Sequence, residues 1–232
     1  MKSDMLATLI LDDGTKFTIR LNVKPVTDTH MIYESWGRHD YTPTGFSIKD
    51  DAIIIDIGAH IGSFSLCAAK LSKNGQVYAY EPYPENFILL QQNVELNNLK
   101  NAHAFQLGVL GQHKKTKLYI DEKNDAGHSL YNKTNQTIEI ECTTLTSIFQ
   151  DNNIAFCDLL KIDCEGAEYE ILLNTPKECF EKIGMIAMEY HDGMYGLKTA
   201  KDIQTLLEDN GFSVKLQTPG AVQGLLYARR NR

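Results

Sequence analysis

The sequence predicts a doubly wound α/β domain, in which a mostly parallel β-sheet is covered by helices on both faces. Apolar runs of strand length alternate with segments of helical periodicity, as expected for parallel strands joined by crossover helices. A glycine-rich turn follows the first of these runs, at the sheet edge where such folds bind ligands. The chain has 232 residues, 43% of them hydrophobic, which is enough for one α/β domain. We expect this domain over residues 50–232, and residues 1–49 should form a short N-terminal segment that is not an independent domain.

The N-terminal segment is expected to contain a hairpin and a lid. Apolar and polar residues alternate on both sides of Asp12-Asp13-Gly14-Thr15, a pattern typical of a β-hairpin. Residues 25–49 have no regular period but carry several ring side chains, namely Tyr33, Trp36, His39, Tyr41 and Phe46. We expect a lid or short helix over a pocket here; an ordinary packing flap is the alternative.

The first half of the main domain alternates strands and helices. Ala52 to Ile57 is a continuous apolar run, which favours a strand buried on both faces. The elements expected after it are a helix over 62–71, a strand over 77–80, a helix from Pro84 and a strand over 102–109.

The second half resumes this alternation after an interruption. Residues 110–143 contain two short β-like pieces, at 117–120 and 137–141, and are expected to form a hairpin-like insertion. The elements expected beyond it are a strand over 159–162, a helix over 167–173, a strand over 185–188, a helix ended by Asn210-Gly211, and closing strands over 212–216 and 225–228 on either side of Pro219-Gly220.

Composition excludes several classes of function. The formal net charge of −7 provides no broad basic surface, so nucleic acid is a disfavoured partner. The start of the chain lacks a signal-peptide pattern and no run approaches the roughly 18 apolar residues of a membrane span. We therefore expect a cytoplasmic protein without a membrane partner. Either a monomer or a homo-oligomer is compatible with the sequence.

The cysteines give information on the redox compartment. Five cysteines without a C-x-x-C pair fit a reduced compartment. Cys164 alone stays open as a functional residue, because it lies inside a motif.

The first chemical motif is Asp56-x-Gly58-x-x-x-Gly62, between an apolar strand and a helix. Glycine lets the backbone turn tightly and approach a ligand, and the helix start offers unpaired N–H groups. Glu81 follows the next strand, 19 residues after Gly62, where a carboxylate can bind ribose hydroxyls. These residues predict an adenosine-containing cofactor, either a dinucleotide or S-adenosylmethionine.

Four segments make the chain resemble a known family. They are Asp56-Ile-Gly-Ala-His-Ile-Gly62, Glu81-Pro-Tyr-Pro-Glu-Asn86, Asn93-Val-Glu-Leu-Asn97 and, most specifically, Leu160-Lys-Ile-Asp163-Cys-Glu165-Gly-Ala-Glu168. The match resembles the FkbM family of methyltransferases over about residues 50 to 192. It implies a class I, Rossmann-like methyltransferase fold of seven strands with the last inserted antiparallel, S-adenosylmethionine as cofactor, and O-methylation of a hydroxyl on a sugar or other small natural-product molecule.

The resemblance also assigns cofactor-binding positions. Asp56, Gly58, His60 and Gly62 fall on the loop that holds the methionine end of the cofactor, and Glu81 on the ribose acid. Leu107-Gly108 falls where adenine lies, although Gly108 is equally compatible with a plain strand-end turn.

Catalytic candidates follow two neighbouring strands. Asp163 should emerge at the carboxyl edge of the sheet, where it is also expected to contact the cofactor. A base must remove the hydroxyl proton during methyl transfer; Asp163 and His191 are the candidates, with an imidazole pKa near 6.5 and Glu189 as its orienting partner. Glu165 and Glu168 are compatible with simple helix-start charges. Asp163, Glu189 and His191 have suitable donors for a divalent ion, but their spacing matches no metal motif and no metal is assigned.

Two other functions remain open at this point. The glycine loop and the helix from Pro84 are also similar to the cofactor half of tRNA-guanine methyltransferases, although the acidic charge opposes this reading. A non-catalytic protein that binds S-adenosylmethionine is the alternative from another class, and cofactor turnover separates it from an enzyme.

Overall fold

The fold is described from a computed structural model over residues 5–21, 27–121, 127–218 and 221–231. The strands in chain order are β1 (Leu6–Ile10), β2 (Lys16–Arg20), β3 (Ile53–Ile57), β4 (Gln76–Tyr80), β5 (Ala102–Phe105), β6 (Gly108–Leu110), β7 (Lys114–Tyr119), β8 (Thr137–Thr144), β9 (Cys157–Ile162), β10 (Ile183–His191), β11 (Phe212–Leu216) and β12 (Gln223–Arg230). The helices are α1 (Thr27–Tyr33), the π-helical turn η1 (Glu34–Arg38), α2 (Ser63–Leu71), α3 (Pro84–Leu96), α4 (Leu145–Asp151), α5 (Glu168–Leu173), α6 (Lys177–Phe180) and α7 (Ala200–Asp209).

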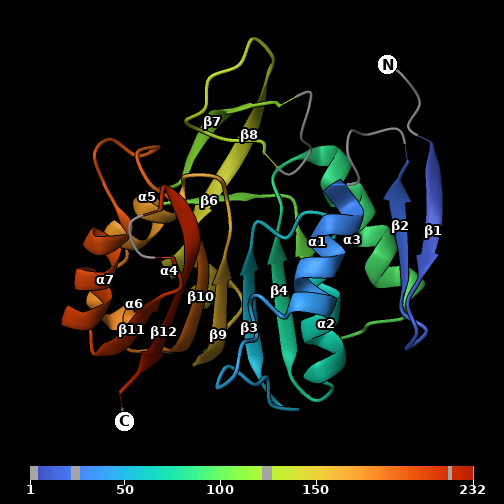
Figure 1. Ribbon diagram of the computed structural model, residues 1–232, viewed down its shortest axis with the longest axis horizontal. Helices are drawn as coiled ribbons and strands as arrows, with labels where there is room; N and C mark the ends of the chain where they lie inside the picture. The colour runs from blue at the N-terminus through green and yellow to red at the C-terminus, as the bar shows by residue number, and fades with distance from the viewer. Residues whose placement is uncertain (1–4, 22–26, 122–126, 219–220, 232) are drawn as a thin grey trace.

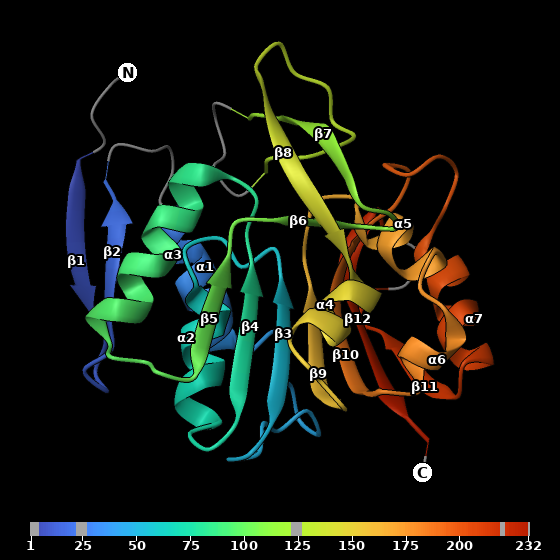
Figure 2. The same cartoon turned by 180° about the vertical axis from the view of Figure 1, so that it is seen from behind.

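A mixed, mostly parallel sheet organises the molecule, so the predicted α/β class is confirmed. Its seven strands run in the order β11-β12-β10-β9-β3-β4-β5 (Figures 1 and 2). The five strands β10, β9, β3, β4 and β5 run parallel to one another, and β12 lies antiparallel between β10 and β11. The carboxyl ends of β3, β4, β9 and β10 therefore meet at one edge.

Alternate residues of β3 face two different helical layers. Ile54 packs with Phe64 and Ala68 of α2, whereas Ile55 belongs to the core shared with α4, α5 and α7. Side chains alternate along a strand, so an unbroken apolar run is required when both faces are covered. Figures 1 and 2 show the two sides, with α1 and α2 in front of the sheet in the first view and α4 in front of it in the second.

The strand expected over 102–109 is wrong as a single element. β5 ends at Phe105 in the main sheet, and β6 starts at Gly108 in a separate sheet of order β6-β8-β7. A Cβ added at Gly108 would lie 2.8 Å from Cys142 Sγ, so glycine allows β6 to pair closely with β8. The predicted hairpin-like insertion is confirmed as the antiparallel pair β7–β8, which rises above the main sheet in Figure 2.

The strand expected over 185–188 is too short. β10 continues to His191 because β12 pairs with it as far as Gln223, beyond the end of its pairing with β9. Glu189 and His191 therefore belong to the strand itself and do not follow it in a loop.

The N-terminal strands β1 and β2 pair antiparallel and pack against α3. Asn93 of α3 accepts a hydrogen bond from Thr18 N (2.6 Å) and donates to Ile61 O (2.9 Å). The stretch expected as a lid contains α1 and η1, while its residues 25 and 26 and the turn at Pro219-Gly220 lie outside the described residues. No helix in the described ranges combines the length and apolar character needed to cross a bilayer.

Candidate active site

A cavity of about 890 Å³ opens at the carboxyl edge of the main sheet. This volume lies within the range of roughly 300–1,000 Å³ that is typical of small-molecule sites. Its wall combines the strand ends with α1, η1 and the second sheet; residues from these elements include Gly58, Glu81, Gly108, Asp163 and Glu189.

The glycine loop after β3 has a backbone that requires Gly58. Its φ is +76°, and a Cβ at this position would lie 1.7 Å from the carbonyl oxygen of Asp163. Gly62 has a φ of +89°, and a Cβ at this position would lie 2.7 Å from Cδ1 of Leu90 in α3. Gly58 and His60 line the cavity, whereas Gly62 shapes the loop against the protein interior.

Glu81 closes one end of the cavity and is held by main-chain donors. Its Oε2 accepts a hydrogen bond from His60 N (2.8 Å), and its Oε1 accepts one from Tyr83 N (2.9 Å). Burial raises the pKa of Glu81 to about 7. The carboxylate thus joins the glycine loop to the end of β4 and retains acceptor capacity for a ligand.

His60 has a defined hydrogen-bonding state. Burial lowers its pKa to about 3, so the ring is neutral. Its Nε2 lies 3.2 Å from Nη2 of Arg20, which can only donate, so Nε2 accepts and Nδ1 carries the hydrogen. Nδ1 is buried without a hydrogen-bond partner among the described residues. Arg20, fixed by Asp28 at 2.7 Å, was not found from sequence because it comes from the hairpin.

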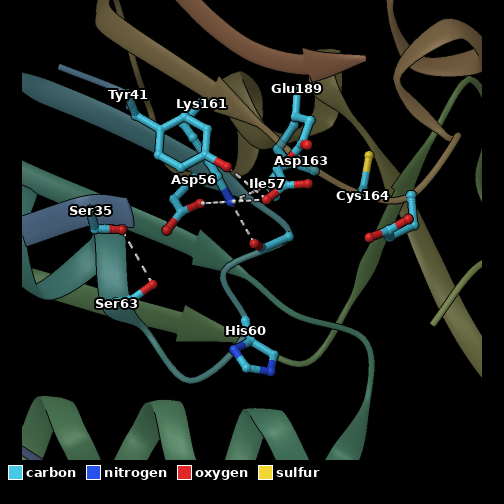
Figure 3. A network of polar contacts seen from close by, with 12 residues as sticks. Ser35, Tyr41, Asp56, Ile57, His60, Ser63, Lys161, Asp163, Cys164 and Glu189 are labelled. Atoms are coloured by element: carbon cyan, nitrogen blue, oxygen red, sulfur yellow. Dashed lines mark hydrogen bonds and ion pairs between the residues drawn. The ribbon is translucent and has the colours of Figure 1, made fainter. Parts of the chain in front are cut away.

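A buried lysine connects the glycine loop to the catalytic candidate. Lys161 Nζ lies 3.1 Å from Asp56 Oδ1 and 3.8 Å from Asp163 Oδ2, and it donates to the Gly58 carbonyl at 2.6 Å (Figure 3). Burial alone would lower the pKa of Lys161, but Asp56 and Asp163 outweigh it and raise this pKa. Asp56 is fully buried and does not line the cavity. It stabilises the glycine loop through Lys161. The signal for Lys161 was a charged residue inside an apolar strand.

Asp163 lines the cavity and is oriented by the N-terminal segment. Tyr41 Oη donates to Asp163 Oδ2 at 2.8 Å, and burial, followed by the charge of Asp163, raises the pKa of Tyr41 well above its ordinary value. Cys164 also lines the cavity, but burial raises the pKa of its thiol, which keeps it protonated and a poor nucleophile.

His191 has other partners than those expected. Its Nδ1 lies 3.3 Å from Glu168 Oε1, and its Nε2 lies 3.5 Å from Glu165 Oε2. Burial would lower its pKa, but these carboxylates outweigh burial and raise it to about 10. The expectations of a pKa near 6.5 and of orientation by Glu189 are therefore wrong. Glu168 is fully buried and contacts His191, so its role is not limited to the favourable charge at a helix start.

The acidic end of the cavity brings together residues from two neighbouring strands. Ligand atoms of Asp163, Glu189 and His191 all lie within 4.8 Å of one another. Burial, followed by the charge of Asp163, raises the pKa of Glu189 to about 8. Glu81 and this acidic cluster thus mark two chemically different parts of one cavity.

Comparisons with known proteins identify relatives and similar folds. Methyltransferase 1 of Beauveria bassiana is 29% identical over 191 residues, covering 73% of this chain and 76% of the relative. The 31-O-demethyl-FK506 methyltransferase FkbM of Streptomyces tacrolimicus is 25% identical over 244 residues, covering 91% of each chain.

Solved structures with the same fold include two methyltransferases. Methyltransferase FkbM from Methylobacillus flagellatus gives a TM-score of 0.54 at 20% identity, over 80% of this chain and 45% of that one. Magnesium protoporphyrin IX methyltransferase from Synechocystis, with bound S-adenosylmethionine, gives a TM-score of 0.50 at 14% identity, over 92% of this chain and 86% of that one. The family model of the methyltransferase FkbM domain matches residues 56–214, so the resemblance is confirmed and this chain belongs to the FkbM methyltransferase family.

Proposed function

We propose that the protein transfers a methyl group from S-adenosylmethionine to a hydroxyl of a sugar or other small natural-product molecule. Family membership assigns methyl transfer and its cofactor. The finer proposal rests on one observation: a single cavity is lined by Glu81 and the glycine loop, which follow β4 and β3, and by the carboxylates of Asp163 and Glu189, which belong to the neighbouring β9 and β10 side of the sheet. Such a cavity can hold a cofactor beside a hydroxylated acceptor.

The residues at the Glu81 end of the cavity fit the proposed cofactor. His60 Nδ1 is a buried donor without a partner among the described residues and would bind the carboxylate of the methionine part. Glu81 would accept hydrogen bonds from the ribose hydroxyls. Leu107 and Gly108, which also line the cavity, would lie against adenine.

The acceptor requires alignment and a place for its proton. When bound, S-adenosylmethionine supplies an electrophilic methyl group, and the electron pair of the broken carbon–sulfur bond stays on sulfur in S-adenosylhomocysteine. The acceptor oxygen forms the new bond to carbon and must lose its hydrogen. Asp163, held by Tyr41 and Lys161, is oriented to accept that proton. His191, with a pKa of about 10, would serve as a charged group that fixes Glu165 and Glu168.

The name of one relative supports oxygen as the methylated atom. The Streptomyces tacrolimicus relative is named for 31-O-demethyl-FK506, so its name describes methylation of an oxygen on a small molecule. The net charge of −7 disfavours a nucleic-acid acceptor.

The test is calorimetric titration with S-adenosylmethionine and NAD, followed by a screen of hydroxylated acceptors for release of S-adenosylhomocysteine. We expect micromolar binding of S-adenosylmethionine alone and product release with a sugar or polyketide alcohol. Binding of NAD instead would contradict the cofactor assignment. Tight cofactor binding with methylation of RNA, or without any turnover, would replace the proposal by one of the two alternatives.

A further inference from the structure

We propose that Asp163, Glu189 and His191 bind one divalent cation of the Mn²⁺ class at the acceptor end of the cavity. Their ligand atoms already lie within 4.8 Å of one another. Metal–ligand bonds of about 2.1 Å require separations of roughly 3–4 Å, which small side-chain rotations can reach. The sequence showed no metal motif because the three ligands come from the ends of two adjacent strands.

His191 is held as a metal-binding histidine would be. Its Nδ1 faces Glu168 Oε1 at 3.3 Å, and Glu168 is itself fixed by hydrogen bonds from Cys164 N and Gly166 N, each of 2.9 Å. A carboxylate on one ring nitrogen keeps the hydrogen there and leaves the other nitrogen free to bind a metal. Nε2 of His191 is buried and makes no hydrogen bond within the described part of the chain, although Glu165 Oε2 lies 3.5 Å away. A cation bound at Nε2 would displace the proton that this nitrogen carries in the metal-free protein.

The two carboxylates are also oriented from outside the cluster. Tyr41 donates to Oδ2 of Asp163 at 2.8 Å, and Gln223 donates to Oε1 of Glu189 at 2.6 Å. Each partner engages one oxygen and holds the carboxylate in place. All three proposed ligands therefore have an outer partner of the kind that supports metal sites.

The charge at this end favours a bound cation. Glu34 and Glu165 line the same cavity as Asp163 and Glu189. Lys161 is engaged 3.1 Å from Asp56 and is 3.8 Å from Asp163. Glu34 is paired with His30 at 3.2 Å and with Arg38 at 3.8 Å, so the excess of acidic groups lies at Asp163, Glu165 and Glu189, which face Lys161 and His191. A divalent ion would balance this excess.

The donor set indicates the class of ion and its role. Two carboxylates suit Mg²⁺ and Mn²⁺, and the imidazole favours a transition metal. Three protein ligands leave positions for water or for an acceptor hydroxyl, whose pKa the ion would lower so that its proton passes to water. Asp163 would then act as a ligand. This role rests on the proposed methyl transfer, whereas cation binding does not.

The test is a titration of chelator-treated protein with MnCl₂, in which electron paramagnetic resonance measures free Mn²⁺. We expect saturable binding of one ion per chain in the micromolar range. His191→Gln and Glu189→Gln should each weaken binding by about 100-fold or more, since even outer partners are worth 10–100-fold. The matched control, Glu34→Gln, removes a charge from the same cavity and should weaken binding by less than about tenfold. Melting curves without metal verify that each variant folds.

The outcomes separate this site from the proposed function. Absence of saturable binding up to about 1 mM Mn²⁺, or equal losses in Glu34→Gln and the ligand variants, would overturn the cation site. S-adenosylmethionine is titrated into the same samples. If it binds and methyl transfer proceeds while Mn²⁺ does not bind, the cation site is wrong and the methyltransferase proposal stands. If Mn²⁺ binds through the three ligands but no hydroxylated acceptor reacts, the cation site stands and the proposed methyl transfer to a hydroxyl is wrong.

Discussion

The two ends of the cavity are built in different ways. At the cofactor end, main-chain N–H groups of His60 and Tyr83 fix Glu81. These three residues follow two consecutive strands, β3 and β4, and the ring of His60 is held from a distant segment, by Arg20. At the acceptor end, side chains from distant segments orient the functional groups, as Tyr41 does for Asp163 and Gln223 for Glu189. A local backbone motif leaves a signature in the sequence, whereas a cluster assembled from several segments does not.

The dependence of the cofactor end on backbone geometry gives the largest expected effect. Gly58→Ala would place a Cβ 1.7 Å from the Asp163 carbonyl oxygen at a φ of +76°. Two neighbouring strand ends would have to separate, so we expect the free energy of unfolding to fall by more than about 4 kcal/mol. Urea unfolding measures this loss, and the variant is expected to bind no S-adenosylmethionine.

Gly14→Ala is the matched control. Gly14 has a similar φ of +81° but no atom within 4 Å of the added Cβ, so only backbone strain of about 1 kcal/mol is expected. Similar losses in the two variants would mean that steric contact with Asp163 is not what requires glycine at position 58.

The acceptor end should control turnover without controlling cofactor affinity. Asp163→Asn keeps the shape but removes the carboxylate charge beside Lys161. This charge is needed both for a proton acceptor and for a cation ligand. We expect turnover to fall by about 100-fold to 1,000-fold, or about 3–4 kcal/mol, with cofactor affinity changed by less than about fivefold. Single-turnover kinetics and calorimetry measure the two quantities. A loss of cofactor affinity as large as the loss of turnover would remove the distinction between the two ends.

The same contrast explains what the sequence could predict. The glycine loop, Glu81 and the placement of Asp163 at the sheet edge follow from strand ends and a local motif. The split of 102–109 into two strands depends on pairing of Gly108 with Cys142 of β8, far along the chain. The partners of His191 could not be inferred, because Glu168 meets it only after α5 packs beside β10. Lys161 was visible as a charge in an apolar strand, but its partners were not.

Glu81 should be the main polar contributor to cofactor affinity. Glu81→Ala removes charge-assisted hydrogen bonds, so we expect the dissociation constant of S-adenosylmethionine to rise by about 10-fold to 100-fold, or about 1.4–2.8 kcal/mol. Calorimetric titration measures this change. An unchanged dissociation constant would contradict the ribose assignment, even if turnover fell.

The pH dependence of cofactor binding should follow from the same carboxylate. Burial raises the pKa of Glu81 to about 7, so the group is largely protonated at pH 6 and largely ionised at pH 8. Ribose hydroxyls bind the ionised form better, and affinity for S-adenosylmethionine should therefore increase as the pH rises through about 7. Glu81→Gln should bind more weakly at pH 8 and show a flatter profile. If the affinity of the wild-type protein for S-adenosylmethionine fell between pH 6 and pH 8, ionised Glu81 would not be the form that binds the ribose.

The smallest expected effect tests the link between the N-terminal segment and the acceptor end. Tyr41→Phe removes the hydrogen bond to Asp163 Oδ2 while keeping the ring packed against Phe64. We expect a loss of about 1 kcal/mol in the free energy of unfolding, a several-fold fall in turnover and unchanged cofactor affinity. The control is Tyr227→Phe, which removes a hydrogen bond to the Asp40 carbonyl (2.7 Å). It should cost similar stability and leave turnover near the wild-type value, because within the described ranges the Tyr227 hydroxyl bonds to Asp40 and Gln217 and to none of the proposed catalytic groups. Equal turnover in the two variants would mean that Tyr41 holds the fold but does not orient Asp163.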